Sequence, residues 1–167
     1  MLRQVVEEVS LQTCDERTIN KGGLTMREIL FRGRMIDNEE WIEGFYVCLN
    51  GVEHRIYDGY AETDCGDFYP DWQKVDPSTV GQYTGLNDKN GVRIFEGDVI
   101  QCKDARGFIR FGAYASAYAS GKTHVGFYIE WIVDRMLRID VGFWADKREV
   151  EVIGNIHDDG DMPEVWS

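Results

Sequence analysis

The segment that most constrains the fold of this chain is residues 80–102, where two apolar stretches flank a turn rich in asparagine, aspartate and glycine. Asn90-Gly91 can supply the positive φ angles of a tight hairpin, and Gly97 in Glu96-Gly97-Asp98 suits a bulge or a sharp bend. The segment therefore predicts a hairpin. We expect one sheet to pass into the next at Gly97.

Alternation of apolar and polar residues predicts further strands before this hairpin. They span residues 28–35, 41–49 and 54–57, with turns at 36–40 and at Asn50-Gly51. In the first strand, Ile29, Phe31 and Met35 are expected to share one face. The second strand is apolar on both faces, so we expect another part of the chain or another subunit to cover its far side.

The remaining segments are less regular. Residues 58–77 contain glycine, proline and several aspartates and are interpreted as a loop or linker, in which Asp76-Pro77-Ser78 opens a short helical turn. Four more strands are predicted at residues 107–112, 124–133, 137–143 and 148–153. Residues 113–121, rich in alanine and serine, are expected to form a surface loop, and the acidic residues 157–164 a frayed tail.

Length and composition favour a mainly β fold. The chain has 167 residues, 18 glycines and three prolines, which suits one core built from many short strands joined by glycine turns. So many short strands around a bent hairpin predict a small closed barrel. Residues 1–25 form an N-terminal extension, either a short helix using Val5, Val6 and Val9 or a segment preceding a natural start at Met26.

The net charge of −12 argues against a general binder of nucleic acid or of anionic membranes and suits a basic partner. No segment approaches the roughly 20 apolar residues of a membrane span, and the first residues do not resemble a secretory signal. We therefore predict a cytoplasmic protein without membrane contact. Its cysteines, at positions 14, 48, 65 and 102, are expected to be free thiols.

Three segments together resemble the YopX family of bacteriophage and prophage proteins. They are MREILFRGRMIDNEEWIEGFYV from Met26, VDPSTVGQYTGLNDKNGVRIFEGDVIQC from Val75, and VEVIGNIHDD from Val150. The resemblance covers residues 26–159 in the family's order, without the 113–121 insert. It implies a mainly β protein, with an N-terminal β portion at 26–74 and an SH3-like barrel at 75–159. The acidic tail at 160–167 follows from the residues themselves. The resemblance implies no activity, because it brings no catalytic residues.

The sequence gives only weak signals for a catalytic or metal-binding site. Two groups of residues have side chains that can bind metals, but neither group has the spacing of a zinc site or a calcium loop. The first group is His54, Asp58, Asp64, Cys65 and Asp67, and the second is His157, Asp158, Asp159 and Asp161. Glu96 and Asp98 are paired acids whose expected role is to accept hydrogen bonds from turn amides. His124 is expected at a strand edge. We predict no catalytic, cofactor-binding or metal-binding residue and no cofactor.

Two basic stretches contain aromatic residues, as in small barrels that stack single-stranded bases. One has Arg27, Arg32 and Arg34 around Phe31, and the other has Arg106, Arg110 and Lys122 around Phe108, Phe111 and Tyr114. The acidic net charge disfavours this use. We therefore expect a non-enzymatic protein-binding module of unknown partner that forms a homo-oligomer. Single-stranded nucleic-acid binding is the alternative.

Overall fold

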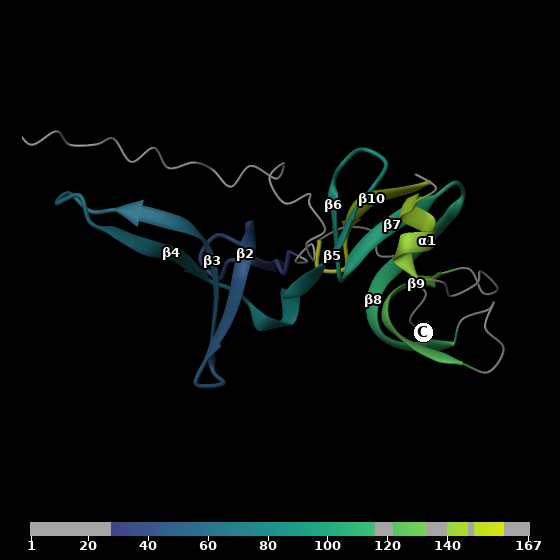
Figure 1. The fold of residues 1–167 in the computed structure, drawn as a ribbon, viewed down its shortest axis with the longest axis horizontal. Coiled ribbons are helices and arrows are strands. Elements are labelled where there is room, and N and C mark those ends of the chain that lie inside the picture. The colour runs from purple at the N-terminus through teal and green to yellow at the C-terminus, as the bar shows by residue number, and fades with distance from the viewer. Residues whose placement is uncertain (1–27, 116–121, 133–139, 147–148, 159–167) are drawn as a thin grey trace, which may run out of the picture.

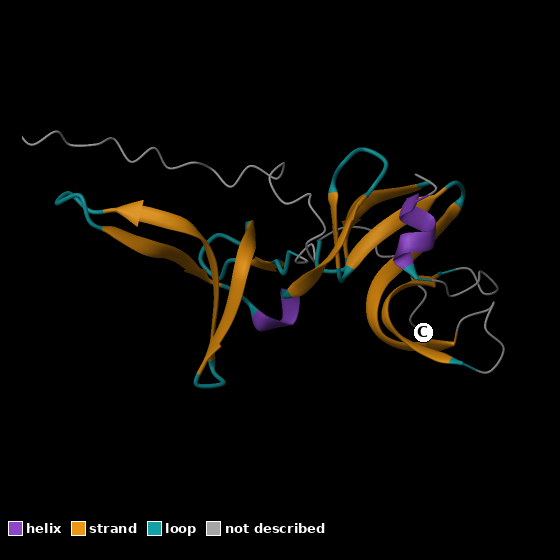
Figure 2. Ribbon diagram, viewed as in Figure 1, coloured by secondary structure: helices purple, strands orange, loops and turns teal. Residues whose placement is uncertain are grey.

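The computed structural model describes residues 28–115, 122–132, 140–146 and 149–158 (Figure 1). Strands predominate within them, which confirms the prediction of a mainly β protein (Figure 2). The elements in chain order are β1 (Phe31–Arg34), β2 (Trp41–Leu49), β3 (Glu53–Glu62), β4 (Phe68–Lys74), the 3₁₀ helix η1 (Pro77–Thr79), β5 (Gly81–Asn87), β6 (Arg93–Phe95), β7 (Asp98–Cys102), β8 (Ala105–Ala115), β9 (Thr123–Trp131), α1 (Val141–Asp146) and β10 (Val150–Asn155). The predictions for residues 1–25 and 160–167 concern segments outside the described residues.

The strands form two antiparallel sheets, of order β4-β3-β2-β1-β5-β6 and β10-β7-β8-β9. Gly97, with a φ of 85°, lies between the last strand of the first sheet and β7 of the second, so the predicted passage between sheets is confirmed. The expected closed barrel is not found among the described strands. Because β5 pairs with β1, the central hairpin extends the N-terminal sheet instead of closing a ring with the C-terminal strands.

The central hairpin is present, but its turn differs from the expected one. Gly91 has a positive φ of 85°, whereas Asn90 is absent from the residues with positive φ. The turn is built around Asp88, whose side chain accepts hydrogen bonds from the amides of Asn90 and Val92 at 2.7 and 2.9 Å. The other predicted hairpin is confirmed, since Asn50 and Gly51 have φ angles of 53° and 72° and join β2 to β3.

The interpretation of residues 58–77 as a loop is wrong. β3 continues to Glu62, and β4 returns beside it from Phe68 to Lys74. A register shift between Tyr57 and Gly59 leaves Asp58 as the extra residue of a bulge, and Pro70 is tolerated because β4 is an edge strand. The predicted helical turn is confirmed, with the Asp76 side chain accepting a hydrogen bond from the Ser78 amide at 2.9 Å.

Two further expectations are corrected. The strand predicted at 137–143 is wrong for residues 141–143, which begin the helix α1. Asp140 Oδ1 accepts the Phe143 amide at 2.9 Å and caps the first turn of this helix. Residues 133–139 lie outside the described residues. The strand predicted at 28–35 is shorter, and Ile29 does not share the buried face of Phe31 and Met35. Ile29 and Leu30 precede β1, where Ile29 is exposed and Leu30 is buried against Tyr83 and Phe95. Of the predicted 113–121 loop, the first three residues belong to β8 and the rest is not described.

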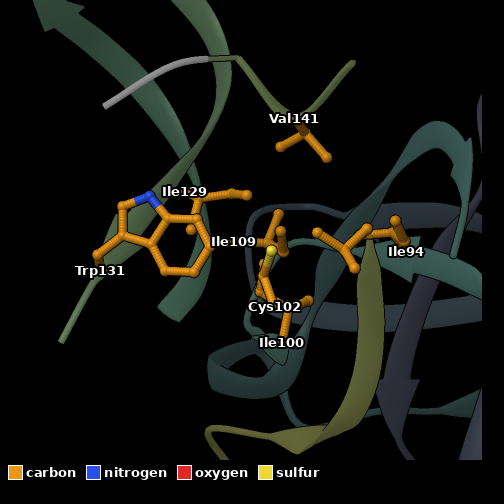
Figure 3. Close-up of a cluster of buried hydrophobic side chains, with 8 residues drawn as sticks. Ile94, Ile100, Cys102, Ile109, Ile129, Trp131 and Val141 are labelled. Carbon is orange, nitrogen blue, oxygen red and sulfur yellow. The ribbon is translucent and has the colours of Figure 1, made fainter. Parts of the chain in front are cut away.

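The largest core lies in the second sheet, between β7, β8, β9, β10, β6 and α1 (Figure 3). Its fully buried members include Ile100 from β7, Ile109 from β8 and Ile129 from β9. Two smaller cores belong to the first sheet. One joins Leu30, Tyr83 and Phe95, and the other joins Ile42, Ile56 and Val75.

Candidate protein-interaction surface

The first sheet has one face that packs inward and one that is only partly covered. Successive side chains of a strand point to opposite faces, and directly paired residues share a face. Ile42 and Ile56 therefore lie on the inner face, where they form a core with Val75. We call the opposite side of β2, β3 and β4 the outer face. Its apolar members are Phe45, Val47, Tyr57, Tyr60, Phe68, Pro70 and Trp72.

Most of the outer face is open to solvent. The exposed fractions are 64% for Phe45, 75% for Tyr60 and 65% for Phe68. Phe45, Tyr57 and Trp72 form one cross-strand row, and Tyr60 and Pro70 form the next, so the apolar side chains follow each other along the strands. This arrangement agrees with the expectation from the sequence that β2 is apolar on both faces, although the described part of the chain does not supply the expected cover for its far side. Contiguous exposed apolar side chains of this kind mark interaction sites.

The same side of the sheet is covered at β1 by residues at the start of β7 and just after β10. The Arg32 guanidinium lies 4.8 Å from the Trp41 ring and 4.6 Å from the Phe95 ring, and it pairs with the fully buried carboxylate of Asp98. Arg34 donates to the backbone carbonyl of His157 at 2.9 Å. Trp41 Nε1 donates to Asp158 Oδ1 at 3.2 Å, so the first residues of the predicted frayed tail are held in place.

Asp98 shows what the paired acids at the Gly97 bend do. Its Oδ2 accepts the Phe95 amide at 2.7 Å, and its Oδ1 accepts from Asn155 Nδ2 at 3.1 Å as well as from Arg32. The prediction that this acid serves turn amides is confirmed. Burial raises the pKa of the Asp98 carboxyl, while the Arg32 charge and the three donors oppose that rise. Burial likewise raises the pKa of Glu96.

Charged side chains near β2 are paired within the chain. Arg55 stacks over the Trp72 ring at 3.6 Å and pairs with Glu53 at 2.7 Å, and Glu53 also meets Lys74 at 3.4 Å. The hydrogen bond and charge of Arg55 lower the pKa of Glu53. Arg93 pairs with Glu43 at 3.1 Å on the other side of Phe45. The part of the outer face around Phe45 is therefore apolar, and the acidic side chains beside it are paired with basic ones.

The residues singled out for metal binding do not converge. No group of three or more metal-ligating side chains is found among the described residues. His54 instead contacts the Tyr46 hydroxyl, and burial raises the pKa of Tyr46. His124 lies in β9 and stacks against Tyr114 at 5.7 Å. Asp159 and Asp161 lie outside the described residues. Cys48, Cys65 and Cys102 are free, as predicted, and only Cys102 is buried.

Three arginines singled out for nucleic-acid binding have partners inside the protein. Arg32 and Arg34 join the two sheets as described above, and Arg110 pairs with Glu130 at 3.1 Å. Phe108 and Tyr114 from the second aromatic stretch are buried, and only Phe111 is well exposed. Arg27 is not described. Arg32, Arg34 and Arg110 are thus committed to ion pairs, hydrogen bonds or stacking that a nucleic acid would have to displace. Arg106 and Lys122 of the second stretch are exposed.

Comparison with known proteins gives one result that bears on identity. A family model described as "YopX protein" matches residues 30–162, which is most of the chain. A search of curated proteins finds no match. None of the helices in the described residues is long and apolar enough to cross a membrane.

Proposed function

The chain belongs to the YopX protein family, and we propose that it is a phage or prophage accessory protein acting as a non-enzymatic protein-binding module in the host cytoplasm. In this proposal it self-associates through the part of the outer face around Phe45. The supporting observation is the exposed aromatic side chains of the outer face, Phe45 on β2, Tyr60 on β3 and Phe68 on β4, which the described residues leave largely uncovered. We further propose that β5 to β10 form an SH3-like unit as an open rather than a closed barrel.

The exposed area is of the right size for recognition. Three aromatic side chains of about 200 Å² each, 64% to 75% exposed, present roughly 400 Å² of apolar surface. A specific interface buries about 800 Å² on each partner, around an apolar centre and a polar rim. The open aromatic residues thus supply about half of such a contact, and the neighbouring side chains of the outer face supply the rest.

A second copy fits the region around Phe45. Both acids beside it are paired within the chain, Glu43 with Arg93 and Glu53 with Arg55 and Lys74. The three bases and two acids leave a net charge of only +1, so two copies of this region repel each other little. A two-fold dimer brings the same patch of each subunit together. We therefore place Phe45 and Val47 at the centre of the contact between copies.

Sedimentation equilibrium over a range of protein concentrations tests the proposal. The wild type should show a mass that rises with concentration, and Phe45→Ser should remain monomeric over the same range because the central apolar anchor is lost. Phe111→Ser is the matched control, since Phe111 is 53% exposed on β8 of the other sheet. A monomeric wild type, or equal association of Phe45→Ser and wild type, contradicts self-association through this face.

Single-stranded nucleic-acid binding is the second candidate, and the structure supports it less. It needs cations free to meet phosphates beside exposed aromatic rings. Arg32, Arg34 and Arg110 have internal partners, and the net charge of −12 repels a polyanion. Protein binding therefore stands first.

A further inference from the structure

The β3–β4 hairpin extends beyond the rest of the first sheet as a two-stranded arm (Figure 1). β2 pairs with β3 only as far as Tyr57, whereas β3 and β4 stay paired to the Glu62–Phe68 end. We call residues 58–71 the arm. A two-stranded ribbon is marginally stable by itself in water, and it usually gains stability by packing on a further strand or surface. Among the described residues no third strand pairs with this part of the ribbon.

The arm carries apolar side chains on both faces. Tyr60 and Phe68 lie on the outer face, and Tyr69, paired with Ala61, lies on the opposite face with 49% of its surface exposed. Aromatic rings are the side chains that protein interfaces most enrich, because they bury a large area at little entropic cost. An arm with exposed rings on both sides is suited to insertion into a groove.

The charge of the arm specifies what kind of groove. Residues 58–71 contain five acidic residues and no lysine, arginine or histidine, the acids being Asp58, Glu62, Asp64, Asp67 and Asp71. None of the five forms an ion pair with another described residue. This contrasts with the region around Phe45, where each acid has a basic partner.

We propose that the arm is the docking element for a basic protein surface, with its aromatic side chains filling apolar pockets between that partner's lysines or arginines. The inference rests on the proposed protein-binding function and assigns a partner class to one part of the outer face. Two arms of two copies repel each other, so the arm is separate from the contact between copies. A nucleic acid is excluded by the same negative charge.

Binding of synthetic peptides to the full-length protein, measured by calorimetry, tests the inference. A peptide of alternating arginine and leucine represents a basic apolar surface, one of arginine and serine lacks apolar groups, and one of glutamate and leucine lacks basic groups. We expect the arginine–leucine peptide to bind at least about tenfold more tightly than either of the others, because both charge and apolar contact contribute.

Matched variants locate the binding. Asp58→Asn/Glu62→Gln/Asp64→Asn removes three charges from the arm, and Asp37→Asn/Glu39→Gln/Asp104→Asn removes the same number elsewhere on the exposed surface. The arm variant should weaken arginine–leucine binding by about tenfold or more, and the control by less than about twofold. Tyr60→Ser/Phe68→Ser should weaken binding to the same extent as the arm charge variant.

Three outcomes overturn the inference. They are an absence of arginine–leucine binding, equal losses in the two charge variants, and a Tyr60→Ser/Phe68→Ser variant that binds as wild type does. Sedimentation of the same variants separates this result from the proposed function. If the arm variants lose concentration-dependent mass while the peptide fails to bind, the arm's occupant is a second copy and the basic-partner inference is wrong. If the wild type is monomeric but binds the peptide through the arm, only self-association fails.

Discussion

At the scale of single residues, Arg32 is the side chain that joins the two sheets. It comes from β1 of the first sheet, stacks between Trp41 and Phe95, and pairs with Asp98 at the start of β7 in the second. Sequence patterning placed Arg32 on a polar strand face and proposed it for nucleic-acid contact. Its actual role depends on a residue 66 positions away in the sequence, and no local pattern reports such a contact.

The variant Arg32→Ala tests this role. Removing one partner of a buried pair leaves a buried charge uncompensated, so the free energy of unfolding at neutral pH should fall by about 3–5 kcal/mol. Arg32 holds the pKa of Asp98 down against burial, so the variant raises that pKa further. The folded variant then binds the Asp98 proton more tightly than the unfolded chain does. Its deficit relative to wild type should therefore shrink as the pH falls through the raised pKa.

Urea denaturation at neutral pH and in mild acid measures both effects. Arg110→Ala is the control, because its pair with Glu130 is about one third exposed and is expected to contribute at most about 1 kcal/mol. Equal losses for Arg32→Ala and Arg110→Ala would show that the pair with Asp98 does not join the sheets.

At the scale of elements, the turn between β5 and β6 links the two sheets a second time. Asp88 Oδ1 accepts the amides of Asn90 and Val92, and Oδ2 accepts the Val152 amide of β10 at 3.0 Å. The Lys89 amide also donates to the Val150 carbonyl at 3.0 Å. The turn is thus positioned by the β10 strand as well as by its own hairpin.

Asp88→Ala should destabilise the protein by about 1–3 kcal/mol, because three backbone amides lose their acceptor and only some of them can turn to water. Asp88→Asn should lose less, since its remaining carbonyl oxygen can still accept. Thermal or urea unfolding measures the loss. Asp104→Ala, in the exposed turn between β7 and β8, is the control and should stay within about 0.5 kcal/mol. An Asp88→Ala variant as stable as this control would contradict the turn's role.

The elements also show how far the sequence predicts the fold. Alternation identified β2, β8, β9 and β10, and glycine chemistry located the turn at Gly51 and the sheet crossing at Gly97. The β3–β4 hairpin was missed, because Gly59 and Pro70 locally indicate a loop. In the structure, cross-strand pairing accommodates Gly59, and the edge position of β4 accommodates Pro70, and neither is visible in the sequence. α1 was missed because Val141 and Phe143 alternate as in a strand, while the Asp140 cap turns them into a helix.

The candidate surface was predictable in part. The two apolar faces of β2 are visible in the sequence and led to the expectation that another part of the chain or another subunit covers its far side. The continuation of this apolar surface across β3 and β4 was not predictable, because long-range pairing sets the register that brings Phe45, Tyr57 and Trp72 into one row. The acids of residues 58–71 were weighed only as metal ligands. Their significance depends on the arm that the missed hairpin builds.

At the scale of the whole molecule, residues at the start of β7 and just after β10 cover the first sheet near β1 and leave β2, β3 and β4 open on the same side. The open part divides into an apolar region around Phe45, whose acids are paired with bases, and an acidic aromatic arm. We propose a second copy as the partner of the first region and a basic protein as the partner of the second.

The most direct test of the open face is hydroxyl-radical footprinting of aromatic side chains in dilute and concentrated protein. In dilute, monomeric protein Phe45, Tyr60 and Phe68 should all be reactive, as their exposed fractions require. At concentrations where the mass rises, Phe45 should become protected, while Phe111 on the other sheet keeps its reactivity. Unreactive Phe45 and Phe68 in the monomer would show that the chain covers this face itself, and that result would contradict the account.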